Sequence, residues 1–155
     1  DSDELQPVDI HEAISLALNL VGYEFRDRIT VHREFGSLPE VRCHSGKLSQ
    51  VFMNLLTNAC QAIPDQGDVW VRTRSENESA DIIVEVEDNG VGIPKEVQER
   101  IFEPFFTTKP VGEGTGLGLS ISYGIVQQHR GKIKVDSRPG EGALFTIHLP
   151  TGRRS

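Results

Sequence analysis

The sequence predicts an α/β fold, a two-layer sandwich of three main helices on a mixed, mainly antiparallel sheet. Segments with the 3.6-residue apolar period of helices are separated by short segments in which every second residue is apolar, as in half-buried strands. The strand-like segments mostly follow one another in pairs across short turns, which favours antiparallel pairing. A chain of 155 residues without a repeat or a long linker indicates a single domain over residues 1–155.

The composition narrows the classes of function. The 23 acidic residues exceed the 16 Lys and Arg residues, and this formal net charge of −7 argues against nucleic-acid binding. No apolar run approaches the ~20 residues of a membrane helix, and the acidic start of the chain is unlike a signal peptide. The two cysteines, Cys43 and Cys60, are not spaced as a metal site or a disulfide framework. We therefore expect a cytoplasmic domain with buried thiols and no membrane contact.

The first third of the chain predicts the start of two helices with strands between them. Asp9, with a Glu three residues later, has the pattern of a helix cap, and the apolar spacing after it predicts a helix to about Val21. Alternation predicts a strand over Ile29–Phe35 and a short one over Val41–Cys43. Ser45 is then a suitable N-cap for a second helix.

The second helix has an apolar stripe and a polar side. Asn54 and Asn58 lie one turn apart on the polar side, and Pro64 marks the end of the helix. The segments Val69–Arg74 and Ile82–Glu87 are rich in β-branched residues and flank a polar loop, which predicts an antiparallel hairpin.

The rest of the chain predicts a loop-rich segment, a third helix and a final hairpin. A short helix is expected over Lys95–Ile101, and Phe102–Gly118 has no clear period and forms the only long loop. The third helix is expected from Thr115 or Gly116 to His129. Alternating apolar residues then predict a hairpin of Ile133–Val135 with Ala143–Leu149.

Two polar motifs stand out in this framework. The carboxamides of Asn54 and Asn58 are suitable oxygen ligands for Mg²⁺, although asparagines on a helix are more often simply solvated. Asp88 shares the strand parity of the apolar residues before it, so we expect a carboxylate on the core side at the strand end. Gly90 and Gly92 would let a flat ring approach the backbone where that carboxylate accepts a hydrogen bond from an amine. Taken alone, Asp-Asn-Gly is more often a turn.

Two further motifs lie in the long loop. Gly112–Ser120 has four alternating glycines and runs into a helix, where bare amides and the positive helix end could hold phosphates. Its spacing fits neither the dinucleotide fingerprint nor the GxxxxGK[ST] phosphate loop. Phe102–Lys109 combines three aromatic residues that could anchor a lid with a Lys that could reach a phosphate, although such aromatics are usually core.

Together, in order and spacing, these four motifs resemble the N, G1, F and G2 boxes of the ATP-binding catalytic domain of two-component sensor histidine kinases. That domain belongs to the GHKL superfamily, shared with gyrase and the heat-shock chaperone ATPases, and the resemblance implies its Bergerat-type ATP-binding fold. The flanking helices and strands extend the resemblance over almost all of the chain. Two departures are Arg130, where the family usually has Gly, and Gln61, near which many relatives carry a basic residue.

The resemblance implies ATP and Mg²⁺ as cofactors and a role for each motif. Asp88 would bind the adenine amino group, and Asn58 would be the Mg²⁺ ligand. Asn54, near the phosphates, and Lys109, near the γ-phosphate, would be the catalytic residues. The other nucleotide-binding positions that the resemblance implies, beside the ring, at the base of the lid and around the phosphates, are Gly90, Gly92, Phe105, Phe106, Gly112, Gly114, Thr115, Gly116, Leu117 and Gly118.

The position before the Mg²⁺ ligand separates hydrolysis from transfer. The hydrolases of the superfamily have a Glu one turn before the Mg²⁺-binding Asn, where it acts as general base on water. Asn54 stands there in this chain, and an amide has no basic site to accept the proton. We therefore expect poor hydrolysis, with the γ-phosphoryl held in line for a nucleophile from another domain.

The resemblance also implies the partners. They are a histidine-bearing dimerisation domain of the same full-length protein, absent from this chain, and a response regulator that receives the phosphate. His11, followed by Glu12, is similar to the start of the family's phosphoacceptor motif but lacks the basic residue and Pro that follow it there. Two alternatives remain open: a nucleotide-binding regulatory module without kinase activity, and a serine/threonine kinase of the anti-sigma-factor type.

Overall fold

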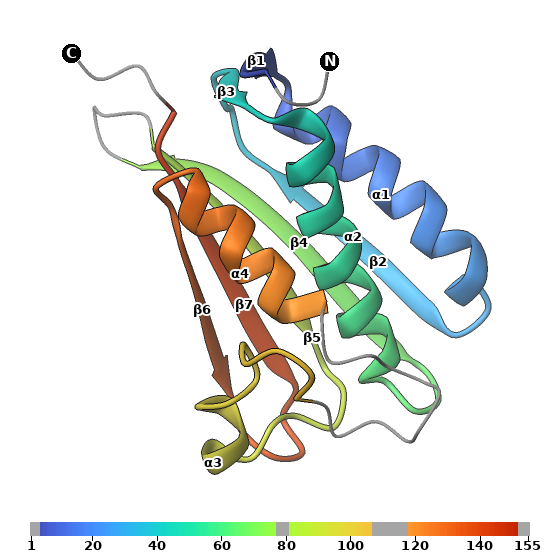
Figure 1. Cartoon of the computed structure of the whole chain (residues 1–155). Helices are drawn as coiled ribbons and strands as arrows, with labels where there is room; N and C mark the ends of the chain where they lie inside the picture. Colours follow the sequence, from blue (N-terminus) through green and yellow to red (C-terminus); the bar gives the residue numbers. More distant parts are fainter. Residues whose placement is uncertain (1–3, 77–80, 107–117, 152–155) are drawn as a thin grey trace.

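The computed structural model describes residues 4–76, 81–106 and 118–151. Figure 1 shows how the helices and strands of these residues are arranged. The elements are β1 (Gln6–Val8), α1 (Ile10–Phe25), β2 (Ile29–Phe35), β3 (Val41–Cys43), α2 (Ser45–Gln61), β4 (Gly67–Glu76), β5 (Asp81–Asp88), α3 (Lys95–Gln98), α4 (Gly118–Gln128), β6 (Lys132–Ser137) and β7 (Ala143–Leu149).

The main sheet has five strands in the order β2-β4-β5-β7-β6, and α1, α2 and α4 lie side by side on one of its faces (Figure 1). Only the β2–β4 pair is parallel, because the chain passes through α2 between these two strands; the other pairs are antiparallel. The two predicted hairpins form β4–β5 and β6–β7. The predicted α/β sandwich on a mixed, mainly antiparallel sheet is confirmed.

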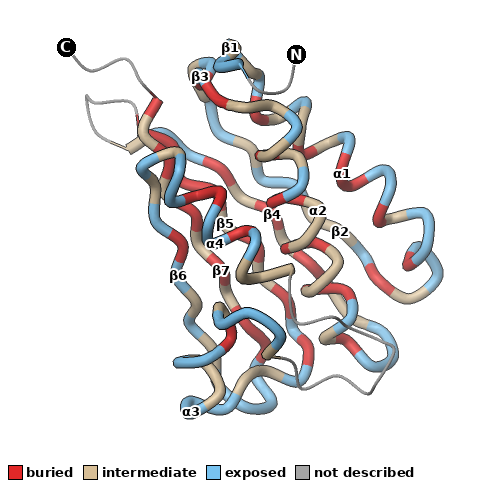
Figure 2. The backbone as a smooth tube through the Cα atoms, in the orientation of Figure 1, coloured by how far each residue is buried: buried red, intermediate tan, exposed pale blue. Residues whose placement is uncertain are grey.

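The core lies between the helices and the sheet, and buried positions recur along the inner sides of both layers (Figure 2). In β5 the residues Ile82, Val84, Val86 and Asp88 point toward the helices, and each is at most 2% exposed. The carboxylate of Asp88 therefore lies on the core side, where its strand parity placed it.

α1 is longer than the sequence predicted. It begins after Asp9, whose Oδ1 accepts hydrogen bonds from the backbone N–H groups of His11 and Glu12, as the cap pattern predicted. The expected end at Val21 was wrong, because the helix continues to the buried Phe25. Packing of this last turn on the core outweighs the low helix propensity of the glycine that follows Val21.

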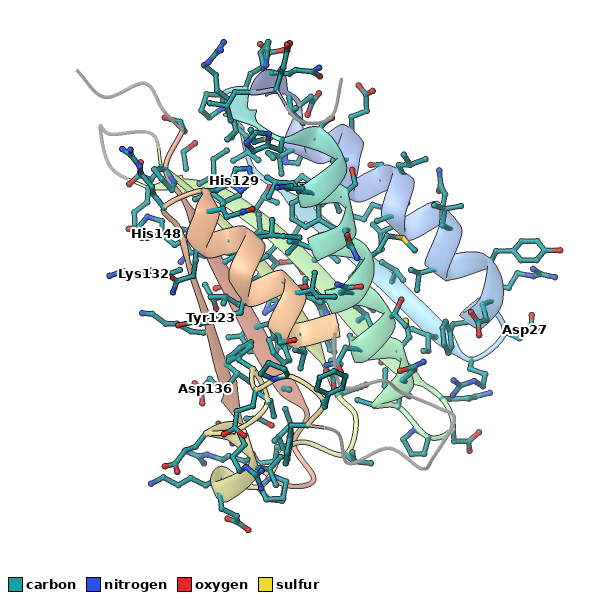
Figure 3. All side chains as sticks on the ribbon, in the orientation of Figure 1. Asp27, Tyr123, His129, Lys132, Asp136 and His148 are labelled. Atoms are coloured by element: carbon teal, nitrogen blue, oxygen red, sulfur yellow. The ribbon has the colours of Figure 1, made fainter. Side chains whose placement is uncertain are left out.

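α2 begins at Ser45 as predicted, but Ser45 is not its cap. The N-cap is His44, whose side chain makes no capping hydrogen bond. The His44 backbone N–H donates instead to Nε2 of His129 at 3.1 Å, which ties the start of α2 to the residue after α4. Figure 3 labels His129 at this end of α4. This contact could not be predicted from the sequence, because its two residues are far apart in the chain.

Three other features differ from the prediction or lie outside the described residues. α3 ends at Gln98 and not at Ile101, because the backbone continues in three-residue turns, with the Arg100 N–H donating to the Val97 carbonyl and the Glu103 N–H to the Arg100 carbonyl. β1 was not predicted; it pairs antiparallel with β3 in a separate two-stranded sheet. The predicted start of the third helix at Thr115 or Gly116 lies outside the described residues. None of the described helices is both long and apolar enough to cross a membrane.

Candidate functional site

Asp88 ends β5 with a buried carboxylate. Its Oδ1 accepts a hydrogen bond from the Gly90 backbone N–H at 2.8 Å. Burial raises the pKa of Asp88 from 3.8 to about 6, against the lowering effect of hydrogen bonds from the Gly90 and Ala143 backbones, and the neighbouring Glu87 charge raises it slightly further. Its Oδ2 is buried and has no hydrogen-bond partner among the described residues. A buried acceptor without a partner is costly, so this oxygen is suited to a donor from a ligand.

The loop after Asp88 is held against the end of α2. The Val91 backbone N–H donates to the Ala62 carbonyl oxygen at 3.0 Å. A Cβ added at Gly90 would lie 2.2 Å from the same oxygen, so only glycine fits there. The close approach that requires Gly90 is thus made by the protein's own backbone, whereas the sequence analysis had connected this glycine with a ligand ring.

Gly92 faces the opposite neighbour, the turn between β6 and β7. It has φ +76°, and a Cβ would lie 2.0 Å from the Arg138 carbonyl oxygen. The Gly140 N–H donates to the Val91 carbonyl at 2.7 Å and joins the two loops. The loop that carries Asp88 is therefore fixed from both sides before any ligand binds.

Asn54 and Asn58 lie on α2 with partly exposed side chains, one turn apart on the same side of the helix. The Asn54 Nδ2 group donates to the Gly118 carbonyl oxygen at 3.0 Å and to Ser122 Oγ at 3.1 Å. The Ser122 hydroxyl in turn donates to the same Gly118 oxygen at 2.9 Å. Two hydrogen bonds from Asn54 thus join the start of α4 to the middle of α2, and the third lies within α4.

The two phenylalanines expected at the base of the lid differ in their surroundings. Phe106 is partly buried against the core, with the Arg100 guanidinium 4.6 Å from its ring centroid. Phe105 is 72% exposed and has φ +66°, a left-handed backbone that is uncommon for a bulky residue. Only Phe106 packs against the core. The other expected residues of this part, Lys109, Gly112, Gly114, Thr115, Gly116 and Leu117, lie outside the described residues.

Both Gly118 and the loop of Asp88 are held by α2. Its middle holds Gly118 through Asn54, and the residue after its end, Ala62, holds the loop of Asp88. The pKa of Cys60, in the last turn of α2, is raised to about 11 mainly by burial; Arg28 lowers it, and the nearby Asp88 carboxylate raises it further. The structure therefore brings Asp88, the two carboxamides and Gly118 together along one helix.

This donor set suits an amine and a hard cation. The unpartnered carboxylate oxygen of Asp88 can accept a hydrogen bond from an exocyclic amine. The carboxamide oxygens of Asn54 and Asn58 are ligands of the kind that Mg²⁺ takes, directly or through water. These observations fit adenine and Mg²⁺.

Ser122 is the residue of this site that the sequence analysis missed. It is fully buried, and with Ile125 and Val126 it occupies the inner face of α4. A serine at helical spacing from two apolar residues was the available signal, because a buried hydroxyl needs hydrogen-bond partners. Those partners are on α2, which the local sequence does not reveal.

Comparison with known proteins decides the family. Residues 43–153 match the family described as histidine kinase-, DNA gyrase B- and HSP90-like ATPase. The chain belongs to this family. The match covers α2, the loop of Asp88, α4 and the final hairpin, so every described part of the site lies within this ATPase domain.

The most similar curated relatives include two sensor kinases. The chain is 45% identical over 148 residues to the sensor kinase CckA of Brucella abortus, which covers 87% of this chain and 15% of that protein. It is 43% identical over 151 residues to the sensor histidine kinase ZraS of Escherichia coli O157:H7, which covers 94% of this chain and 31% of that protein. The chain thus spans less than a third of the length of these relatives.

Solved structures with this ATPase fold include three histidine kinases. The mycobacterial sensor histidine kinase MprB superimposes with a TM-score of 0.84 at 32% identity, over 94% of this chain and 97% of that chain. ShkA in complex with AMPPNP gives 0.83 at 28% identity, over 94% and 31% of the two chains. ThkA in complex with the response regulator TrrA gives 0.81 at 28% identity, over 97% and 43%. The fold is that of histidine kinase catalytic domains.

Proposed function

We propose that this chain, over residues 1–155, is the ATP-binding catalytic domain of a two-component sensor histidine kinase, and that the domain lies in the cytoplasm. The observation that carries the proposal is the buried Asp88 carboxylate, fixed on one oxygen by Gly90 and without a described partner on the other. Family membership and the sensor-kinase names of the relatives support the same conclusion.

The nucleotide would bind along α2. Asp88 Oδ2 would accept the hydrogen bond of the adenine amino group, and the rigid loop of Gly90 and Gly92 would border the ring. Asn58 would be a ligand of Mg²⁺, and Asn54 would act near the phosphates. Binding of AMPPNP, an ATP analogue, by the structurally similar ShkA supports this arrangement. Lys109 and the residues from Gly112 to Leu117 would complete the phosphate site, as the resemblance implies.

The reaction would be transfer and not hydrolysis. No general base stands at position 54, so water would not be activated there. The domain would hold the γ-phosphoryl group in line for a histidine on the dimerisation domain of the same full-length protein. The phosphate would then pass to a response regulator, a partner class that the structure of ThkA with TrrA supports.

The proposal is tested by incubating the chain with ATP labelled at the γ-phosphorus and a histidine-bearing dimerisation domain supplied separately. Acid-labile label on that domain, lost when its histidine is replaced, is the expected result. Acid-stable label on a hydroxyl side chain would indicate the serine/threonine kinase, and ATP binding without transfer would indicate the regulatory module. Failure to bind ATP would overturn all three.

A further inference from the structure

The hydrogen-bond network around Asn54 has one chemically allowed orientation. The Asn54 Nδ2 group carries two hydrogens, and the Gly118 carbonyl and the Ser122 hydroxyl accept one each. The Ser122 hydroxyl hydrogen is itself donated to the Gly118 oxygen, so neither partner has a hydrogen to offer Asn54. A flipped carboxamide would place Oδ1 against the Gly118 carbonyl oxygen, which can only accept, and could bond to Ser122 only by taking the hydroxyl hydrogen away from Gly118. The network therefore fixes which atom of Asn54 is left for a ligand.

That atom is an acceptor. With both Nδ2 hydrogens used on α4, Oδ1 is the part of the carboxamide that can meet a ligand on the polar side of α2. The oxygens of an ionised triphosphate are acceptors too and cannot bond to Oδ1. A metal ion or a metal-bound water can, since Mg²⁺ takes oxygen ligands and usually keeps several waters.

We propose that Ser122 is a positioning residue of the magnesium–nucleotide site: with the Gly118 carbonyl it fixes the Asn54 carboxamide so that Oδ1 faces the hydrated cation. Its hydroxyl is fully buried and is used both as donor and as acceptor in this network. Gly118 is the last of the four alternating glycines in the sequence, so the same network ties this glycine to the side of α2 that carries Asn54. This inference rests on the proposed function.

The experiment compares ATP affinity with Mg²⁺ and with a chelator by calorimetry. In the Ser122→Ala variant, the gain in affinity that Mg²⁺ gives should fall about fivefold, as expected for the loss of one hydrogen bond. The affinity measured in chelator should stay unchanged. In the Asn54→Ala background, Ser122→Ala should have no further effect, because its partner is already absent. The control is Ile125→Val, which loosens the same face of α4 and should leave the Mg²⁺ gain intact.

A second measurement does not depend on nucleotide. In the ¹⁵N-labelled, nucleotide-free chain, the two side-chain amide protons of Asn54 should exchange slowly with solvent, and faster in Ser122→Ala. Unprotected protons in the wild type, or equal losses of affinity with and without Mg²⁺ in Ser122→Ala, would overturn the inference alone. No ATP binding by the folded wild type would overturn the proposed function and the metal role of Ser122 with it.

Discussion

Asp88 is held in an environment that opposes its charge. Burial raises its pKa in the folded chain to about 6, from the ordinary value of 3.8 that applies when the chain is unfolded. The folded state therefore binds more protons than the unfolded state between about pH 4 and pH 6. Stability must fall as the pH rises through this window, and above it the ionised carboxylate remains destabilising. A ligand amine that donates to this group offsets the same penalty.

Replacing Asp88 by Asn should abolish ATP binding and increase the stability of the folded chain. Without nucleotide, Asp88→Asn is expected to raise the free energy of unfolding by roughly 1 to 3 kcal/mol at pH 7.5, with the gain shrinking toward pH 4. ATP titration of the same variant should show no binding. Denaturant unfolding across the pH range and calorimetry measure the two effects. A variant that is less stable at pH 7.5, or that binds ATP like the wild type, contradicts this account of Asp88.

Asn58 makes a separate prediction about the cation. Asn58→Ala should remove most of the Mg²⁺ dependence of ATP binding while leaving the affinity in chelator nearly unchanged, because an amide oxygen for the metal is lost but the adenine contact remains. The matched control is Asn19→Ala, which removes an exposed asparagine from α1. Equal responses to Mg²⁺ in Asn58→Ala and Asn19→Ala would exclude Asn58 as a metal ligand.

At the scale of elements, the C-terminal end of α4 carries a strained residue. The Gly131 N–H donates to the Val126 carbonyl and the Arg130 N–H to the Gln127 carbonyl, the two bonds of a Schellman motif. The residue between helix and Gly131 in this motif is left-handed, and here it is Arg130, with φ +62°. Gly131 is required for a different reason, since a Cβ there would lie 2.3 Å from the His148 carbonyl oxygen.

Arg130→Gly is therefore expected to stabilise the chain. Removing the left-handed strain gains about 1–2 kcal/mol, and the greater freedom of glycine in the unfolded chain takes back about 0.5–1 kcal/mol. The net increase should be roughly 0.5 to 1 kcal/mol in denaturant unfolding. Gly131→Ala should destabilise in the same assay. A loss of stability in Arg130→Gly would show that the arginine side chain contributes more than its backbone strain removes.

Gly22, inside α1, is a glycine that nothing in the packing requires. A Cβ there would meet no atom within 4 Å, and the residue borders a small apolar cavity whose lining includes Leu18, Phe25 and Leu56. Gly22→Ala should raise the free energy of unfolding by about 0.5–1 kcal/mol through helix propensity. Gly90→Ala is the contrasting variant, expected to destabilise because its Cβ would clash with the Ala62 carbonyl oxygen. Similar thermal shifts in both would refute the distinction.

The elements also show where sequence reasoning succeeds and where it stops. The periodicity of α2 and the parity of β5 placed Asn54, Asn58 and Asp88 on the correct elements, because these patterns depend on neighbours in the sequence. β1, the His44–His129 contact and the Ser122 network were not predicted. Each of them joins segments that are distant in sequence, so the information lies in the tertiary arrangement.

At the scale of the whole molecule, the site gathers on one part of the helical layer. The loop after β5 and the end of α2 meet at one end of the sheet, and β1 pairs with β3 at the other end (Figure 1). α2 runs between the two ends, and α4 joins it at Asn54. The antiparallel order of β5, β7 and β6 places the turn beside Gly92 at the same end as Asp88.

This arrangement predicts a local nucleotide footprint. Binding of AMPPNP with Mg²⁺ should slow hydrogen exchange at three described places: the end of β5 with the loop to Gly92, the second half of α2, and the first turn of α4. β1 and β3 should exchange at an unchanged rate, since they pair with each other at the opposite end of the sheet from the loop of Asp88. Ligand binding slows exchange where it stabilises local structure, so the pattern maps the site directly.

Hydrogen exchange followed by mass spectrometry can separate these segments, and Asp88→Asn serves as the control that should show no nucleotide effect anywhere. Slower exchange confined to β1 and β3 would place the nucleotide at the opposite end of the sheet from Asp88 and would contradict the proposed site. Uniform slowing over the whole chain would instead indicate that the nucleotide stabilises the chain against global unfolding. In that case the slowing of exchange in the wild type and in the Ser122→Ala variant should be in proportion to their ATP affinities.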